Sequence, residues 1–244
     1  MKTLKIEKYG DQIRLVKIKA NSFKCAEKER KKADTLEEIE QRFDNNLARA
    51  KGRIIELGYC NDWEYFVTLT INGEKRNRYS LPQYIKELGY WIGNYNKKFS
   101  CKLKYILVPE QHKDGAYHMH GLFAGVAPDS LVKNEYNFLD LPYYAKSFGF
   151  ISLSPIRDKD KTVSYITKYV TKAVGQTSLK KGEHLYYSSR GLAGKETVYE
   201  LPVPDDFKLD YENEFCGISW RKPRDVEKMI FDIIASGEQP QKEN

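Results

Sequence analysis

The chain has 244 residues, 41% of them hydrophobic and 31% charged, which is enough for one well-cored domain with extensions or for two small domains. No stretch approaches the roughly 18 uncharged apolar residues that a membrane span needs, and the N-terminus lacks the continuous apolar segment of a signal peptide. The four cysteines form no CxxC pair, which argues against a zinc knuckle or a disulfide framework and indicates a reducing cytoplasm.

The net charge of +7 is unevenly placed along the chain. Residues 64–200 contain 20 Lys and Arg against 13 Asp and Glu, a surplus of seven positive charges, whereas residues 201–244 contain 6 against 10, a surplus of four negative charges. Together with 18 Tyr and 11 Phe, the basic middle suits a surface that neutralises phosphates and stacks bases. Charge alone does not identify a nucleic-acid-binding protein, because lysine-rich faces also serve solubility.

The N-terminal part of the chain predicts a hairpin and a helix. Charged and aliphatic residues alternate over residues 4–18 and are interrupted at Gly10, which predicts a β-hairpin. Apolar residues recur at steps of three and four over residues 34–57, which predicts an amphipathic helix that ends near Gly58.

The middle of the chain alternates strands and helices. Runs of β-branched and aromatic residues predict four strands, at 65–71, 103–109, 116–124 and 150–155. Apolar spacing of three and four predicts two helices, at 81–99 and 160–174. The order β-α-β-β-β-α favours an α+β fold in which helices cover a central antiparallel sheet. Beyond Gly175 the pattern predicts no further element.

Two histidines stand on one predicted strand, in the sequence YHMHGLF. Strand side chains alternate between faces, so His118 and His120 point the same way. Two neighbouring imidazoles and a carboxylate can bind one divalent metal ion. Glu110 is the candidate carboxylate, because the turn after its strand folds it back toward the pair, and His112 competes as the third ligand. An HxH sequence by itself more often marks the solvent face of a half-exposed strand.

Two tyrosines share a face of the predicted helix in the sequence VSYITKYVTK. Tyr165 and Tyr169 are four residues apart, and Lys168 and Lys172 repeat that spacing beside them. A phenol with a pKa of about 10 is a poor nucleophile at neutral pH, so it needs cationic neighbours or a metal-activated electrophile. Alone, a Tyr-x-x-x-Tyr pattern usually reflects packing.

In chain order, YFVTLTI, the E-x7-H-x-H pattern from Glu110 to His120, and YITKYVTK resemble the three motifs of HUH replication initiators. The doubled tyrosine is most similar to initiators of small single-stranded DNA phages, microviruses and related prophage elements. The segments NNLARAKGRIIELGYCNDWEYFVTLT and LYYSSRGL also resemble these prophage-borne proteins, so the resemblance covers about residues 40–195. Relaxases carry their tyrosine before the histidines, so the motif order argues against them.

The resemblance implies a metal-dependent nickase. Glu110, His118 and His120 would hold Mg²⁺ or Mn²⁺. Tyr165 or Tyr169 would attack the scissile phosphate of single-stranded or hairpin origin DNA. The attack would leave a 5′-phosphotyrosine and a free 3′-hydroxyl, which starts rolling-circle replication. The second tyrosine would allow a second transfer that closes the displaced circle.

Other residues and partners follow from the same resemblance. Lys168 or Lys172 would stabilise charge on the phosphate and the phenolate. The sequence contains no GxxxxGK[ST] phosphate loop, so a host helicase would unwind the DNA and a host polymerase would extend it. Two alternatives remain open: an IS200-like single-strand transposase, which would need an obligate dimer, and a non-catalytic single-stranded DNA-binding module.

The expected organisation is one domain with an extension. A single HUH endonuclease domain would span residues 1–200, with an N-terminal strand-helix extension at 1–62 and a catalytic core at about 63–175. An acidic C-terminal extension would follow at 201–244.

Overall fold

The structure is a computed structural model that describes residues 2–18, 36–135, 137–174, 183–204, 206–213 and 216–235. The chain divides into two compact units, Glu40–Leu192 and a second that combines Met1–Ile39 with Ala193–Asn244. All described strand pairs are antiparallel, so the predicted α+β class with an antiparallel sheet and covering helices is confirmed. None of the described helices combines the length and the apolar character that a membrane crossing requires.

The unit Glu40–Leu192 contains a seven-stranded sheet in the order β6-β7-β8-β3-β5-β4-β9. Its strands are β3 (Tyr65–Thr70), β4 (Lys104–Gln111), β5 (Tyr117–Ala124), β6 (Val132–Lys133), β7 (Leu139–Asp140), β8 (Ile151–Pro155) and β9 (Tyr187–Ser188). Its helices are α1 (Leu36–Cys60), α2 (Leu81–Phe99), η2 (Pro128–Ser130), α3 (Pro142–Ser147) and α4 (Lys159–Val174). The predicted strands and helices of this region are confirmed with small shifts of their ends, whereas β6, β7, β9 and α3 carry no clear sequence pattern.

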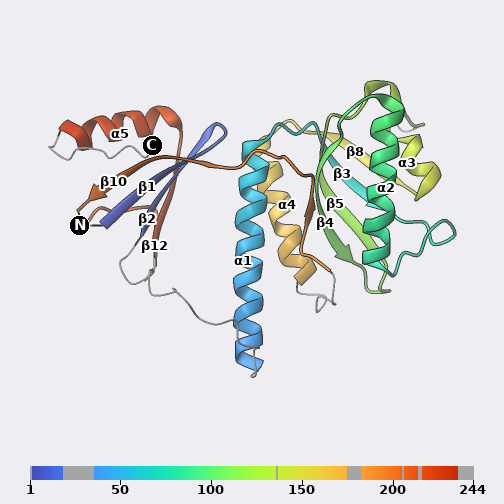
Figure 1. The fold of residues 1–244 in the computed structure, drawn as a ribbon, viewed down its shortest axis with the longest axis horizontal. Helices are drawn as coiled ribbons and strands as arrows, with labels where there is room; N and C mark the ends of the chain where they lie inside the picture. Colours follow the sequence, from blue (N-terminus) through green and yellow to red (C-terminus); the bar gives the residue numbers. More distant parts are fainter. Residues whose placement is uncertain are drawn as a thin grey trace. The chain divides into compact units, whose positions relative to one another are not determined.

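Helices cover both faces of this sheet (Figure 1). On one face, α2 and α3 pack through a core rich in aromatic side chains, among them Tyr84, Trp91, Tyr95, Phe123, Tyr144 and Phe148. On the other face, α1 and α4 pack through aliphatic side chains, among them Ala50, Ile54, Leu57, Val108, Leu122, Ile166 and Val170. Strand alternation therefore places the residues on either side of Met119, a member of the aromatic core, on the face of α4.

Helix α1 does not end at Gly58, as its sequence predicts, but continues to Cys60. Gly58 instead lies at the contact between two helices, because a Cβ atom there would be 2.8 Å from Cγ2 of Val163 on α4. Valine is stiff at its Cβ branch and cannot easily turn away. The glycine thus permits the close approach of α1 and α4.

A methyl group at this contact should destabilise the unit. We expect Gly58→Ala to lower the free energy of unfolding by about 1–3 kcal/mol, the usual cost of overpacking. The matched control is Gly52→Ala in the same helix, where nothing lies within 4 Å of the added Cβ. That variant should gain about 0.5–1 kcal/mol from helix propensity. Urea unfolding followed by circular dichroism measures both, and equal effects of the two substitutions would show that the helix contact is not tight.

The other unit is a five-stranded sheet in the order β10-β1-β2-β12-β11 with helix α5. Its elements are β1 (Lys2–Tyr9), β2 (Gln12–Ile18), β10 (Glu196–Val203), β11 (Tyr211–Glu212), β12 (Cys216–Arg221) and α5 (Pro223–Ala235). The predicted hairpin is confirmed as β1 and β2. The core contains Leu4, Ile6, Leu15, Leu201, Val203 and, from α5, Val226.

This division differs from the expected domain of residues 1–200 with a separate extension. Strand β1 pairs with β10, and the paired residues Lys5 and Glu200 are 195 positions apart in the sequence. Strand β2 pairs with β12, so residues beyond 201 belong to the same sheet as the start of the chain. No local pattern reveals such distant pairing.

A buried carboxylate links three segments of this unit. Glu7 accepts hydrogen bonds from Nε and Nη2 of Arg14 at 2.8 and 2.6 Å, and another from Lys195. Burial by itself raises the pKa of Glu7, but the hydrogen bonds and charges of Lys195 and Arg14 outweigh it and lower the pKa. The carboxylate stays ionised and fixes β1, β2 and the segment before β10 to one another.

Candidate functional site

Strand register places the predicted metal ligands in neighbouring rows of one sheet face. Glu110 on β4 pairs with His118 on β5, and His120 follows two residues later on the same face. On the other side of β5, strand β3 places Thr70 opposite His118 and Thr68 opposite His120. The face is the one that α4 covers in part.

His120 is held at both of its ring nitrogens. Its Nε2–H donates to Oε2 of Glu110 at 2.7 Å, because an ionised carboxylate only accepts. The hydroxyl of Thr68 lies 3.1 Å from Nδ1 and donates to it when the ring is neutral. Glu110 and His120 are only 7% and 9% exposed, so their hydrogen bond is shielded from water.

His118 has a different set of contacts. Oγ1 of Thr70 lies 3.3 Å from its Nδ1, and its ring lies against that of His112, with centroids 4.0 Å apart. Burial, and next the charge of His112, lower the pKa of His118. The ring is therefore neutral at pH 7, the form that binds metal ions.

The structure brings Glu110 and His120 into contact but does not gather His118 with them around a common point. Within the part of the chain that the structure describes, no three or more His, Cys, Asp and Glu side chains are close enough together to hold a metal ion. The donor types and the strand positions nevertheless fit a divalent cation, since a carboxylate and two imidazoles with hydroxyl-bound Nδ1 atoms share one face. The hydrogen bond between Glu110 and His120 uses the atoms that such a cation would need.

The two tyrosines of α4 lie together at this face. Their hydroxyl oxygens are 2.8 Å apart, and their rings are nearly perpendicular, with centroids 5.0 Å apart. The ring of Tyr169 stacks on that of His120, with centroids 3.9 Å apart and planes 20° apart. Tyr165 is 49% exposed. The tyrosine pair thus joins the histidine strand through Tyr169, while Tyr165 is open to solvent.

The electrostatic surroundings of Tyr169 oppose ionisation. Burial, then the hydrogen bond with Tyr165, and the negative charge of Glu110 raise the pKa of the Tyr169 phenol well above its usual value. A raised pKa reduces the phenolate fraction at neutral pH, so nucleophilic attack needs positive charge nearby. Lys168 is exposed and, among the described side chains, makes no hydrogen bond to either phenol, and the side chain of Lys172 lies outside the described residues.

Three residues of β3 belong to the site although their sequence pattern assigned them no part in it. Phe66 packs beside the tyrosines, with its ring centroid 5.3 Å from that of Tyr165. Thr68 and Thr70 contact the histidines. The signal was present in YFVTLTI, where these three residues alternate with buried Val67 and Leu69, but its use requires knowing that β3 pairs with β5.

The comparison with known families agrees with this geometry. Residues 64–174 match a family model of replication-associated proteins of the ORF2 type, and the match includes β3, β5 and α4. No curated protein and no solved structure matches the chain. The resemblance of the motifs to those of replication initiators is confirmed by this match.

Proposed function

We propose that this protein initiates rolling-circle replication by nicking single-stranded DNA through tyrosine transesterification. The observation that carries the proposal is the stacking of Tyr169 on His120, which joins the tyrosine pair to the buried carboxylate–imidazole pair. The family match over residues 64–174 supports a role in replication. The site lies on an ordered sheet and helix, which suits the holding of a phosphate for in-line attack.

In the proposed reaction, the phenol oxygen of Tyr165 or Tyr169 bonds to phosphorus while the bond from phosphorus to the 3′ oxygen breaks. The phenol loses its proton to solvent, and the 3′ oxygen takes up a proton and leaves as a hydroxyl. The 5′ side of the DNA stays on the tyrosine. Because the two hydroxyls are hydrogen-bonded, each phenol gives the other a partner that accepts or returns this proton.

Glu110, His118 and His120 would hold Mg²⁺ or Mn²⁺, and the ion when bound supplies positive charge to a non-bridging phosphate oxygen. For this, Nε2 of His120 has to lose the proton that it shares with Glu110. A threonine hydroxyl both donates and accepts, so Thr68 holds His120 in either tautomer. Lys168 and Lys172 are proposed to stabilise phosphate charge, and a host helicase and polymerase would complete replication.

The central test is a covalent adduct. We expect the full chain, incubated with a library of single-stranded and hairpin oligonucleotides and Mn²⁺, to give a protein–DNA adduct that survives denaturing electrophoresis. Labels at the two DNA ends should separate, with the 3′ fragment bound to protein and the 5′ fragment released with an extendable 3′-hydroxyl. Chelation of the metal should abolish the adduct.

The control is blunt duplex DNA of the selected sequence, which should give little adduct because its backbone is not exposed to the tyrosines. Hydrolytic cleavage without an adduct would contradict the transesterification. Binding of single strands without any cleavage, with either ion, would favour a non-catalytic DNA-binding module.

A further inference from the structure

An exposed phenylalanine lies in the same row as the proposed metal ligands. Phe150 immediately precedes β8, and its carbonyl oxygen accepts a hydrogen bond from the amide of Thr70 at 2.9 Å. This bond extends the β3–β8 ladder by one pair. Since directly opposed residues share a sheet face, Phe150, Thr70, His118 and Glu110 form one row across the sheet.

The ring of Phe150 remains in solvent, 59% exposed. Helix α4 lies over β4 and β5, which are separated from β8 by β3. The next residues on this face of β8 are Ser152, half-buried, and Ser154, exposed. A single exposed phenylalanine is ordinary on a protein surface. This one is distinguished by its place on an open face beside the histidines.

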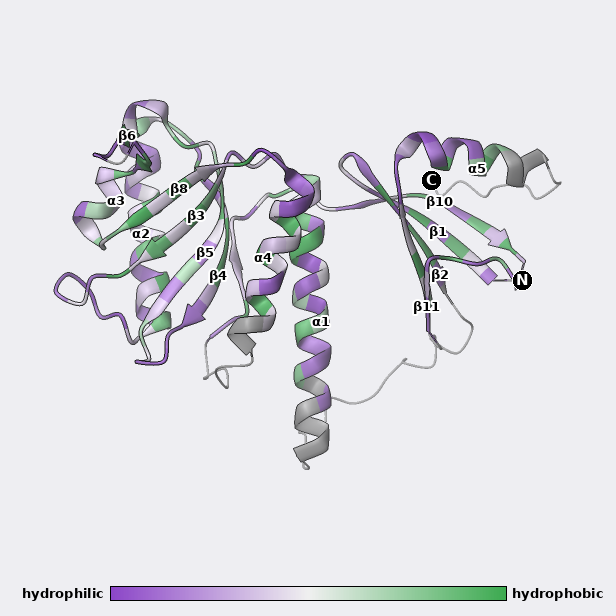
Figure 2. Ribbon diagram, turned by 180° about the vertical axis from the view of Figure 1, so that it is seen from behind, coloured by the Kyte–Doolittle hydropathy of each residue, from purple (hydrophilic) through white to green (hydrophobic). Residues whose placement is uncertain are grey.

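Cationic side chains lie at the same end of the sheet. The carbonyl oxygen of Arg78 accepts a hydrogen bond from the amide of Tyr117, the neighbour of His118. Arg78 belongs to the hydrophilic connection between β3 and α2, drawn in purple in Figure 2. Its guanidinium forms an ion pair with Asp114.

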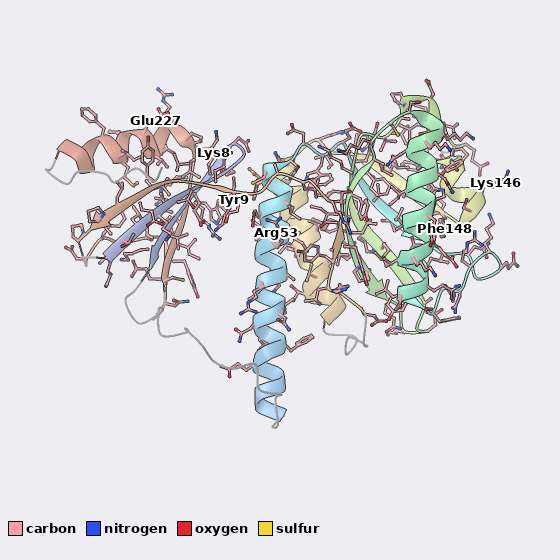
Figure 3. All side chains as sticks on the ribbon, viewed as in Figure 1. Lys8, Tyr9, Arg53, Lys146, Phe148 and Glu227 are labelled. Atoms are coloured by element: carbon pink, nitrogen blue, oxygen red, sulfur yellow. The ribbon has the colours of Figure 1, made fainter. Side chains whose placement is uncertain are left out.

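A basic hollow lies on the chain segment just before Phe150. It has a volume of about 440 Å³ and is lined by Lys75, Arg76, Tyr143, Lys146 and Ser147. Lys146 extends from α3, and Phe148 follows in the turn after that helix (Figure 3). Lys75 donates to the carbonyl oxygen of Ala145 at 2.8 Å, and Arg76 pairs with Glu87 at 3.2 Å, so both cations are oriented at the hollow.

We propose that Phe150 is a stacking platform for a base of the single-stranded DNA that the site cleaves. This inference rests on the proposed function. Two strand spacings separate Phe150 from His118, about 10 Å, which corresponds to roughly three nucleotides at a stacked spacing of about 3.4 Å. The basic hollow offers a place for a phosphate of the same strand. Every base has a π face, so the platform adds affinity for single strands without choosing a sequence.

The test is a binding measurement without divalent ions, in which no cleavage takes place. A labelled oligothymidylate and an abasic strand of the same length serve as probes, read by fluorescence anisotropy. We expect Phe150→Ala to weaken oligothymidylate binding by about 5- to 150-fold, the usual effect of losing one aromatic stack, and to leave abasic binding unchanged. Phe150→Trp should restore binding, whereas Phe150→Leu should not, because leucine has no π face.

The matched control is Tyr90→Ala. Tyr90 is 66% exposed on α2, the helix that covers the opposite face of the sheet, and its loss should change neither affinity. The proposal is overturned if wild type does not bind oligothymidylate, if Phe150→Ala binds it as wild type does, if leucine rescues as well as tryptophan, or if abasic binding falls equally. Failure of the proposed nickase function would show separately, as a wild-type chain that binds but forms no adduct with Mn²⁺.

Discussion

The double variant Tyr165→Phe with Tyr169→Phe should form no covalent adduct with DNA, whereas each single variant should keep part of the first nicking reaction. Phenylalanine preserves the rings that pack on His120 and Phe66 and removes only the two hydroxyl oxygens. The fold should therefore persist while the nucleophiles are lost. Because the hydroxyls are 2.8 Å apart, a phosphate held near one is within reach of the other after a small side-chain rotation.

Closure of the displaced circle should suffer in either single variant, since the second transfer needs a second free phenol. Peptide mapping of the adduct and a circle-release assay measure the two steps. An adduct in the double variant would refute the assignment of both nucleophiles. Adducts confined to one tyrosine, with full circle release when the other is phenylalanine, would refute the alternating scheme and leave the nickase function intact.

His118→Ala should abolish cleavage and leave single-strand binding within a few-fold of wild type. Loss of a residue that merely orients a metal ligand typically costs 10–100-fold, so loss of a ligand should reduce cleavage by more than about 100-fold. The control is His112→Ala, because His112 lies against His118 and is the other candidate for third ligand.

His112→Ala should retain most of the activity. The opposite result, with His112→Ala inactive and His118→Ala active, would assign the third ligand to His112. Normal nicking by both single variants in Mn²⁺ would show that neither histidine is needed for metal binding. Circular dichroism of each variant checks that the sheet is intact.

The part of the fold that carries the site follows from local periodicity. Alternation with a period of two places His118 and His120 on one strand face, and a four-residue step places Tyr165 and Tyr169 on one helix face. Both placements are seen in the structure. They depend only on residues close in sequence, which is why the sequence alone is sufficient for them.

Distant pairings were beyond the sequence patterns. The two histidines contact threonines of β3, which β4 and α2 separate from β5 in the chain, so this register cannot be derived from spacing. Similarly, Gly58 reads as a helix end because glycine often stops helices, and only the packed Val163 explains why the helix continues. The rotation of each imidazole depends on neighbours such as His112. For that reason the contact of Glu110 with His120, and not with His118, could not be predicted.

The pairing of β1 with β10 gives the two units different schedules during synthesis on the ribosome. The unit Glu40–Leu192 fills its cores with its own residues and has everything it needs once that segment has emerged. Strands β1 and β2 emerge first and wait for β10 and β12, which come last. A two-stranded hairpin is marginally stable and leaves two open edges. Nascent chains that stop before residue 196 should therefore carry a formed DNA-site unit and an aggregation-prone N-terminus, the natural target for a chaperone near the exit tunnel.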